Sequence, residues 1–239
     1  MRTRRDLASP WGYRVWYHDS EFDTLMDEAR ERAAVDLFTP GSGIDVEELL
    51  LRVYGISPDF AADLPDEVLG RTLFSGDGQI EIEINRTLSE RAEHDRTARR
   101  RLRSTLGHEC AHVVGHAHLQ VSDGTLSLFE YDEPRQSRVL CRSVSIQLGG
   151  AGVDWWEYQA NRGMASLLLP RPILKTEIPT VLGSCGYRTV TAALADGRGK
   201  EVINAIADLF DISFEMTLYR LQSTGFIPDM RQGTLAATG

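Results

Sequence analysis

Apolar residues recur at helical spacing through most of this chain. Residues 20–37 carry one apolar stripe, which begins behind Asp19 and Ser20, two side chains suited to capping a helix. A shorter helix is predicted over residues 46–54, because its apolar pattern ends at Gly55, a residue that favours helix stops. The same spacing predicts further helices over residues 88–117, 154–168, 190–195, 199–210 and 213–222.

One short stretch alternates between apolar and charged residues instead. Its residues are Ile80, Glu81, Ile82, Glu83 and Ile84. A glycine-rich turn at residues 75–78 separates this stretch from residues 71–74, which predicts an antiparallel hairpin. We interpret the alternating stretch as a half-solvated edge strand. A small antiparallel sheet packed on helices predicts an α+β fold.

The chain divides into three expected parts. Residues 1–18, in which aromatic residues stand among arginines, are predicted to form a partly ordered N-terminal arm. Residues 19–175 are predicted to form one domain, and residues 176–239 a C-terminal helical segment. Residues 119–152 carry no clear pattern and fit either short strands or a long surface excursion.

The charge of the chain argues against one class of function, nucleic-acid binding. The 239 residues carry a formal net charge of −9 with a pI of about 5.2, which argues against general nucleic-acid binding. An arginine-rich run at residues 96–103 is better explained as the solvated start of a helix than as a nucleic-acid patch, because no aromatic residues interleave it.

We expect a cytoplasmic protein without a membrane span. No stretch approaches the roughly 18 apolar residues that such a span needs. The basic start of the chain is not followed by the apolar run of a secretory signal. The three cysteines, Cys110, Cys141 and Cys185, are widely spaced and predict free thiols in a reducing compartment.

The strongest chemical signal is the motif H-E-x-x-H at residues 108–112. In a helix, His108 and His112 lie one turn apart on the same face, where both imidazoles can reach one cation. Glu109 is turned about 100° away and can hold a water beside the metal instead of binding it. Because catalytic zinc usually has three protein ligands, the motif requires one more from elsewhere.

Glu157 is the favoured third ligand, since two histidines and a glutamate form a known catalytic zinc set. Asn161, one helical turn further, is placed to hydrogen-bond a ligand imidazole or Glu157 itself. His116 continues the spacing of His108 and His112, but a further turn normally carries a residue past the metal. We therefore expect His116 behind a ligand or in the pocket wall, with an ordinary core or surface histidine as the alternative.

Together these segments resemble the ImmA/IrrE metallopeptidases. The resemblance rests on residues 103–112 with His116, and on residues 157–170, which are similar to the family's E-x-x-A-N-x-F-A-A-x-L-L-x-P. Residues 206–221 are similar to the family's small helix-turn-helix-like segment, and the whole resemblance covers about residues 44–228. The family more often carries other residues at packing positions, namely Ser104, Gly107, Cys110, Ala111, Gly163 and Met164.

The resemblance implies a zincin-like core followed by a C-terminal helix-turn-helix-like segment. It implies one Zn²⁺ per chain, with Mn²⁺ as a substitute, held by His108, His112 and Glu157, and it implies Glu109 as general base. The implied activity is that of a zinc-dependent endopeptidase acting on a protein partner. That partner is a helix-turn-helix repressor, and its cleavage relieves repression in a stress or mobile-element response.

Details of substrate binding follow from this expectation. An extended peptide adds antiparallel to the edge strand at residues 80–84, where Glu81 and Glu83 favour basic substrate residues. Tyr158 and His116 are the candidate donors to the oxyanion, and the sequence does not choose between them.

Two other function classes stay open. One is a non-catalytic, zinc-containing regulator that binds a protein partner or DNA through its C-terminal helices. The acidic net charge and the few basic residues of residues 199–223 argue against direct DNA binding. The other is a zincin acting on small peptides, such as an aminopeptidase. That class needs an acidic pocket for the substrate amine, for which the sequence contains no motif.

Overall fold

The computed structural model describes residues 2–6, 12–75, 78–121, 137–142 and 154–228. The chain divides into two compact units, residues 1–37 with 45–167 and residues 38–44 with 168–239. The sequence suggested a boundary at residues 175–176 instead. A helix at Arg171–Ser184, which the apolar pattern did not predict, spans that position.

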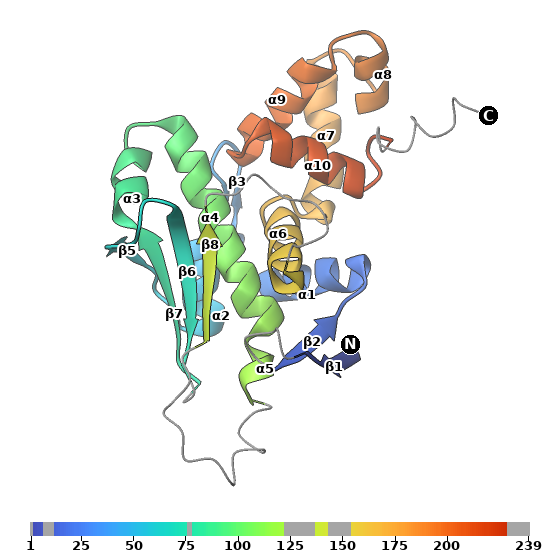
Figure 1. The fold of residues 1–239 in the computed structure, drawn as a ribbon. Helices are drawn as coiled ribbons and strands as arrows, with labels where there is room; N and C mark the ends of the chain where they lie inside the picture. The colour runs from blue at the N-terminus through green and yellow to red at the C-terminus, as the bar shows by residue number, and fades with distance from the viewer. Residues whose placement is uncertain (1, 7–11, 76–77, 122–136, 143–153, 229–239) are drawn as a thin grey trace, which may run out of the picture. The chain divides into compact units, whose positions relative to one another are not determined.

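The first unit is a mixed α+β structure, in agreement with the expected fold class (Figure 1). Its strands are β1 (Arg2–Arg5), β2 (Tyr13–Trp16), β5 (Asp59–Ala62), β6 (Val68–Phe74), β7 (Ile80–Asn85) and β8 (Ser137–Arg142). Its helices are α1 (Asp19–Arg32), α2 (Val46–Tyr54), α3 (Arg86–Ala92), α4 (Arg96–His116), α5 (His118–Val121) and α6 (Trp155–Leu168), whose last residue falls in the second unit.

The main sheet has the strand order β5–β7–β6–β8. β6 and β7 form the antiparallel hairpin that the sequence predicts, in register from Gly70 opposite Ile84 to Phe74 opposite Ile80. β5 pairs parallel to β7, and β8 pairs antiparallel to β6. α4 packs on this sheet against β6 and β7 (Figure 1).

The expectation of an edge strand at residues 80–84 is wrong. β7 lies between β5 and β6, so these residues form an inner strand: Ile80, Glu81, Ile82, Glu83 and Ile84. The two faces were assigned correctly, since Ile82 and Ile84 are buried and Glu81 is exposed. Alternation shows that one face of a strand is solvated, but it says nothing about neighbours within the sheet. β7 therefore has no role here as a substrate-binding edge.

The region predicted as one helix over residues 88–117 contains two helices. Asn85 caps α3, accepting hydrogen bonds from the backbone N–H groups of Thr87 and Leu88. Asp95 caps α4, accepting from the N–H of Thr97. α4 changes character along its length, because its first turns carry exposed arginines whereas every residue from Thr105 to Val113 is buried. The H-E-x-x-H motif lies in this buried half.

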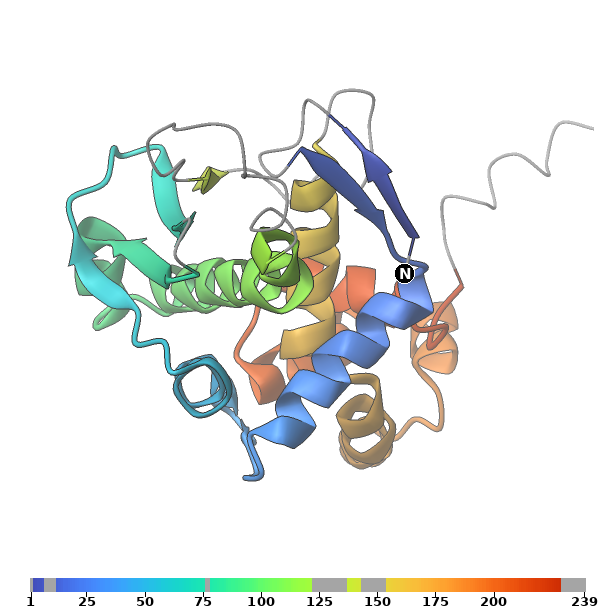
Figure 2. The same ribbon diagram turned by 90° about the horizontal axis from the view of Figure 1, so that it is seen from below.

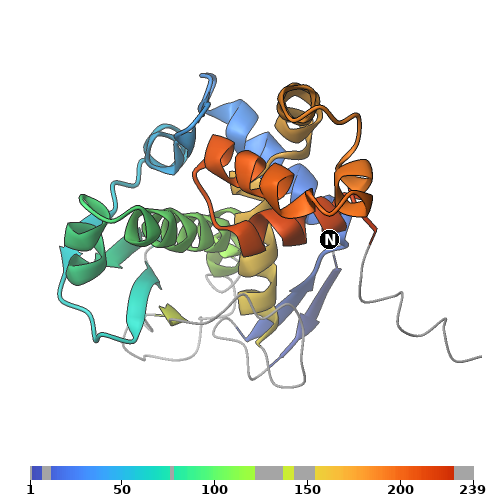
Figure 3. The ribbon, with the colours of Figure 1, turned by 90° about the horizontal axis from the view of Figure 1, so that it is seen from above.

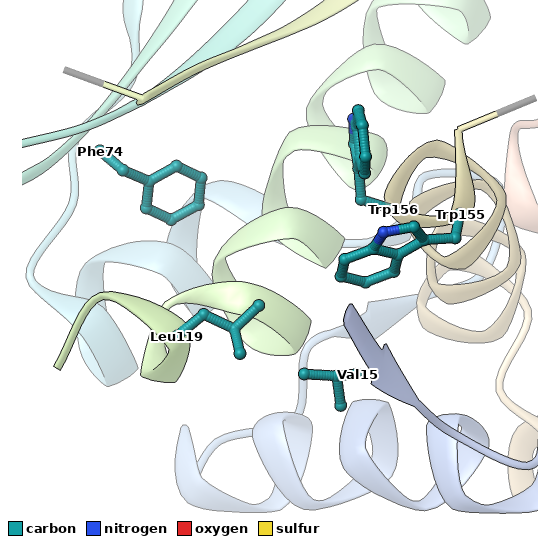
Figure 4. Packing of buried hydrophobic residues seen from close by; sticks show 5 residues of the cluster. All are labelled: Val15, Phe74, Leu119, Trp155 and Trp156. Atoms are coloured by element: carbon teal, nitrogen blue, oxygen red, sulfur yellow. The ribbon is translucent and has the colours of Figure 1, made fainter. Parts of the chain in front are cut away.

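The N-terminal arm folds as a hairpin of β1 and β2 in which Thr3 pairs with Val15. Val15 is fully buried and packs in a cluster with Phe74, Leu119, Trp155 and Trp156 (Figure 4). The hairpin lies beside the start of α6 and leads into α1 (Figure 2). The region expected to be a partly ordered arm thus contributes Val15 to the core of the first unit.

Phe22 on α1 fills the space between α4 and α6. A Cβ added at Gly115 of α4 would lie 2.8 Å from Cζ of Phe22, and one at Gly163 of α6 would lie 2.5 Å from its Cε1. The Gly163 position would also bring a Cβ to 2.8 Å from the Cβ of Ala111 on α4. The two glycines thus make room for one aromatic ring, and this packing sets how closely the two helices approach.

The second unit is helical with one short pair of strands. Its elements are β3 (Phe38–Thr39), β4 (Gly43–Ile44), α7 (Arg171–Ser184), α8 (Val190–Ala195), α9 (Gly199–Phe210) and α10 (Phe214–Ser223). α9 packs against α7, α8 and α10 (Figure 3). The buried Arg220 of α10 donates its Nε–H to the carbonyl of Leu169, 3.0 Å away. Among the described residues, no helix combines the length and apolar character needed to cross a membrane.

Candidate metal centre

Two helices bring His108, His112 and Glu157 together. α4 carries the two histidines and α6 carries the glutamate, and their candidate ligand atoms all lie within 4.8 Å of one another. The Nε2 atoms of His108 and His112 are 3.0 Å apart. Glu157 places Oε2 at 3.1 Å from the first nitrogen and Oε1 at 3.5 Å from the second. These three residues could hold a metal ion.

The donor set and its spacing fit a small divalent ion. In a tetrahedral zinc site with bonds of about 2.1 Å, neighbouring ligand atoms lie about 3.4 Å apart. The separations in this centre, 3.0, 3.1 and 3.5 Å, lie around that value. Two imidazoles and one carboxylate are also ligands that zinc takes in catalytic sites.

The charges of the centre favour a cation. Desolvation raises the pKa of Glu157, but attraction to His112 and the hydrogen bond from His108 outweigh it, so the pKa lies below its ordinary value. Burial acts to lower the pKa of His108, but Glu157 and the nearby Glu109 raise it overall. The pKa of His112 is lowered, mainly by desolvation. The ionised carboxylate of Glu157 therefore draws positive charge to the point between the imidazoles.

Asn161 supports His108 directly. Its Oδ1 lies 3.1 Å from Nδ1 of His108. Because an amide oxygen only accepts, Nδ1 of His108 carries a hydrogen whether or not Nε2 is also protonated against Glu157, so Nε2 is the nitrogen that a metal would take. The hydrogen bond between Asn161 and a ligand imidazole, which the spacing of Asn161 from Glu157 suggested, is present, and Asn161 accepts it.

His112 is supported through a longer chain of contacts. Its Nδ1 lies 3.1 Å from Nδ1 of His116, whose Nε2 lies 3.0 Å from Oε1 of Gln159. Gln159 donates from Nε2 to the carbonyl of Val15, 2.8 Å away. Burial lowers the pKa of His116 to about 3, so its imidazole is neutral at pH 7. His116 thus stands behind a candidate ligand, with both ring nitrogens engaged.

Glu109 lies beside the centre and is fully buried. Thr72 of β6 donates its hydroxyl hydrogen to Oε2 of Glu109 at 2.6 Å. The strand approaches closely at Gly70, where an added Cβ would lie 2.7 Å from Cγ2 of Thr105 and 3.3 Å from Oε1 of Glu109. One carboxylate oxygen is therefore fixed by a hydroxyl group on the sheet.

Tyr158 lies in a different environment. It lines a cavity of about 390 Å³ formed by β2, the start of α1 and the start of α6. The lining of this cavity includes none of the three candidate ligands. Residues 119–152, which gave no clear prediction, contribute α5 and β8, and the remainder of that stretch lies outside the described residues.

Sequence reasoning missed three contributors to the centre: Val15, Thr72 and Gln159. Gln159 is two residues from Glu157, which places the two side chains about 200° apart around a helix, so periodicity does not join them. Thr72 is a buried threonine on an inner strand, and such residues are common in cores. Val15 acts through its backbone carbonyl, which no sequence pattern reveals.

Comparisons of the chain with protein-family models, with curated proteins and with solved structures find no match.

Proposed function

We propose that this chain is a zinc-dependent peptidase that hydrolyses a peptide bond in a protein partner. The observation that carries the proposal is the convergence of His108, His112 and Glu157 from two helices, with Glu109 next to the first histidine. Two buried imidazoles, each with a further hydrogen bond behind it, together with a partly buried carboxylate, are typical of a metal site.

The residues of the centre divide the chemical work. Zinc, when bound, polarises the scissile carbonyl and makes water a better nucleophile at neutral pH. Glu109 takes the proton of the attacking water and passes it to the leaving amine. The hydroxyl of Thr72, 2.6 Å from Oε2 of Glu109, orients this carboxylate. His116 is engaged by His112 and Gln159, so it positions His112 and does not serve as the oxyanion donor.

The identity of the partner rests on the resemblance to ImmA/IrrE proteins. In that reading the substrate is a helix-turn-helix repressor, and cleavage relieves repression in a stress or mobile-element response. The most direct search incubates the protein with the product of the neighbouring gene, with and without a chelator, and examines both chains by mass spectrometry. A fragment formed only without chelator identifies the substrate and the scissile bond.

Glu109→Gln separates hydrolysis from metal binding. The variant should keep one zinc per chain and lose cleavage, because the amide cannot accept the proton. Glu81→Gln is the matched control, since Glu81 is exposed on β7. Cleavage by Glu109→Gln at the wild-type rate would exclude the mechanism, and a wild-type protein that binds no zinc would exclude the proposed function.

A competing function is a metal-containing regulator that binds a protein or DNA through its C-terminal helices without hydrolysis. The complete burial of Glu109 and its hydrogen bond to Thr72 favour this reading, because a general base must reach water and substrate. Regulation that survives unchanged in Glu109→Gln but is lost in Glu157→Ala would support the regulator. Loss in both variants supports the peptidase.

A further inference from the structure

A continuous chain of buried polar groups joins the N-terminal hairpin to one candidate ligand. It runs from the carbonyl of Val15 through Gln159 and His116 to Nδ1 of His112, with distances of 2.8, 3.0 and 3.1 Å. Val15 and His116 are fully buried, and Gln159 is 9% exposed. Solvent therefore does not compete for these hydrogen bonds.

Each hydrogen bond in this chain has one allowed direction. A backbone carbonyl only accepts, so the atom of Gln159 facing Val15 is the amide nitrogen. The amide oxygen of Gln159 then faces Nε2 of His116 and also only accepts. The hydrogen of a neutral His116 is thereby placed on Nε2, and its Nδ1 is left as an acceptor.

The hydrogen-bond direction at His116 also determines which nitrogen of His112 carries a hydrogen. Nδ1 of His116 accepts from Nδ1 of His112, so the hydrogen of His112 lies on the side away from Glu157. Nε2 of His112 then presents a lone pair, as a metal ligand must. In the opposite direction a hydrogen would stand on Nε2 of His112, only 3.0 Å from Nε2 of His108, at the place that an ion needs.

We propose that Gln159 is a positioning residue of the metal centre. It fixes the tautomer of His116 and through it that of His112, while the carbonyl of Val15 fixes the orientation of the Gln159 amide. The N-terminal hairpin therefore helps to orient His112, a candidate ligand. This inference rests on the metal-binding part of the proposed function and is independent of peptide hydrolysis.

Packing holds the chain of hydrogen bonds in place. The ring of Trp155 packs edge-on against His116, with centroids 5.5 Å apart and planes at 89°. Val15 lies in the same apolar cluster as Trp155, as Figure 4 shows. The hydroxyl of Tyr17 donates to the carbonyl of Gly115, 3.2 Å away, next to His116 on α4. Val15 in β2 therefore packs with Trp155 of α6, and Tyr17, directly after β2, is bonded to α4 beside His116.

The first experiment measures zinc affinity of the full chain by competition with a chromophoric chelator. Gln159→Leu keeps the size of the side chain but removes both hydrogen bonds, and the affinity should fall about 10- to 100-fold, as for other outer-sphere contacts. His116→Leu should fall by a similar factor. Because Gln159 acts through His116, the double variant should match His116→Leu alone. Additive losses would mean that Gln159 only fills space, and would overturn the proposal.

The second experiment separates the tautomer from the hairpin. Gln159→Glu keeps an acceptor for His116 but puts a carboxylate oxygen where Nε2 of Gln159 lies, 2.8 Å from the carbonyl of Val15. The carboxylate favours a protonated His116, whose Nδ1 then donates towards His112, so zinc affinity should fall as in Gln159→Leu. Val15→Asp places a charge in the apolar cluster and should displace β2. It should weaken zinc binding in the wild-type background but cause little further loss in Gln159→Leu, where the amide that Val15 orients is already absent. Trp16→Asp, on the exposed side of the same strand, is the matched control.

The outcomes distinguish this inference from the proposed function. Circular dichroism confirms that each variant is folded before its affinity is compared. Cobalt(II) bound in place of zinc should show an altered visible spectrum in Gln159→Leu, because the geometry at His112 changes. Zinc binding by the wild type with an unchanged affinity in folded Gln159→Leu overturns the inference alone. Failure of the wild type to bind zinc overturns the proposed function.

Discussion

Two histidines of the same helix, one turn apart, are held in unlike ways. His108 is supported by one side chain, Asn161, from the helix that also carries the third candidate ligand. His112 is supported through His116 and Gln159, and that chain ends at a backbone carbonyl 144 residues before Gln159. The support of His108 comes from the same short motif as Glu157, whereas the support of His112 also needs the N-terminal hairpin. Sequence motifs therefore account for the contacts of His108 but not for those of His112.

The largest loss of zinc affinity is expected from removing Glu157, because this residue lies close to both His108 and His112. Glu157→Ala takes away the carboxylate that faces both Nε2 atoms. Zinc affinity should fall by more than the roughly 10- to 100-fold expected for any outer contact. Equilibrium dialysis with metal analysis measures this, and Glu81→Ala serves as the exposed control. Full zinc occupancy in Glu157→Ala would mean that another residue is the third ligand.

Removing the support of His108 should have the next largest effect. Asn161→Leu leaves Nδ1 of His108 without its partner, and zinc affinity should fall about 10- to 100-fold. Combined with Gln159→Leu, the loss should exceed that of either variant, because the two side chains act on different imidazoles. This contrasts with the pair Gln159 and His116, whose losses should not add. An Asn161–Gln159 double variant no weaker than one single variant would mean that the two supports are not separate.

The burial of His116, which supports His112, should also affect how the free energy of unfolding of the metal-free protein depends on pH. Burial holds the pKa of His116 at about 3, against an ordinary value of 6.5. The unfolded chain takes up a proton below pH 6.5 that the folded chain does not, so this contribution is lost as pH falls from 6.5 towards 3. Between pH 6.5 and 5 the free energy of unfolding should fall by about 2 kcal/mol from this group.

Urea unfolding in the presence of a chelator measures that slope. His116→Leu should show a shallower decline over the same pH range, whatever its absolute stability. Glu81→Gln should keep the wild-type slope, since Glu81 is exposed on β7. Equal slopes in the wild type and His116→Leu would show that His116 accepts a proton in the folded protein.

The smallest effect is expected from Thr72, which contacts neither Asn161 nor the His116–Gln159 pair. Thr72→Val removes the hydroxyl that donates to Glu109 and should lower the free energy of unfolding by roughly 1 kcal/mol. Zinc affinity should stay unchanged, because Thr72 contacts neither imidazole support, while any cleavage rate should fall. Calorimetry and chelator competition measure the two quantities. A weakened zinc affinity would place Glu109 and Thr72 within the metal support.

Much of the fold follows from local sequence. α2 ends where its stop residue predicted, at Gly55, which takes a φ of 68°. The helix predicted over residues 154–168 is α6, Trp155–Leu168. The antiparallel pairing of β6 with β7 followed from alternation and a glycine-rich turn. The predicted helix at residues 20–37 ends earlier, at Arg32, because Ala34 takes a φ of 56° that no helix continues through.

Most of the remaining wrong or missing predictions depend on contacts between residues that are distant in the sequence. The edge assignment of β7 failed because its parallel partner β5 is a short strand without alternation. α7 was missed because prolines flank and interrupt its pattern, although Pro172 is tolerated in a first turn. In the centre, the spacing of Glu157 and Asn161 on one helix was readable. The contacts of Gln159 and Val15 were not, since they depend on how the hairpin packs.

The ring of Phe22 bears on how small a fragment of this protein can be. A fragment beginning at residue 38 would keep every residue of the H-E-x-x-H motif, together with Glu157 and Asn161. It would lose the aromatic ring that separates Gly115 from Gly163, along with the Val15 carbonyl. The two glycine-lined surfaces would face a void, and the spacing between the histidines and Glu157 would no longer be set. A search for minimal relatives by motif alone would therefore accept chains in which the metal centre is not assembled.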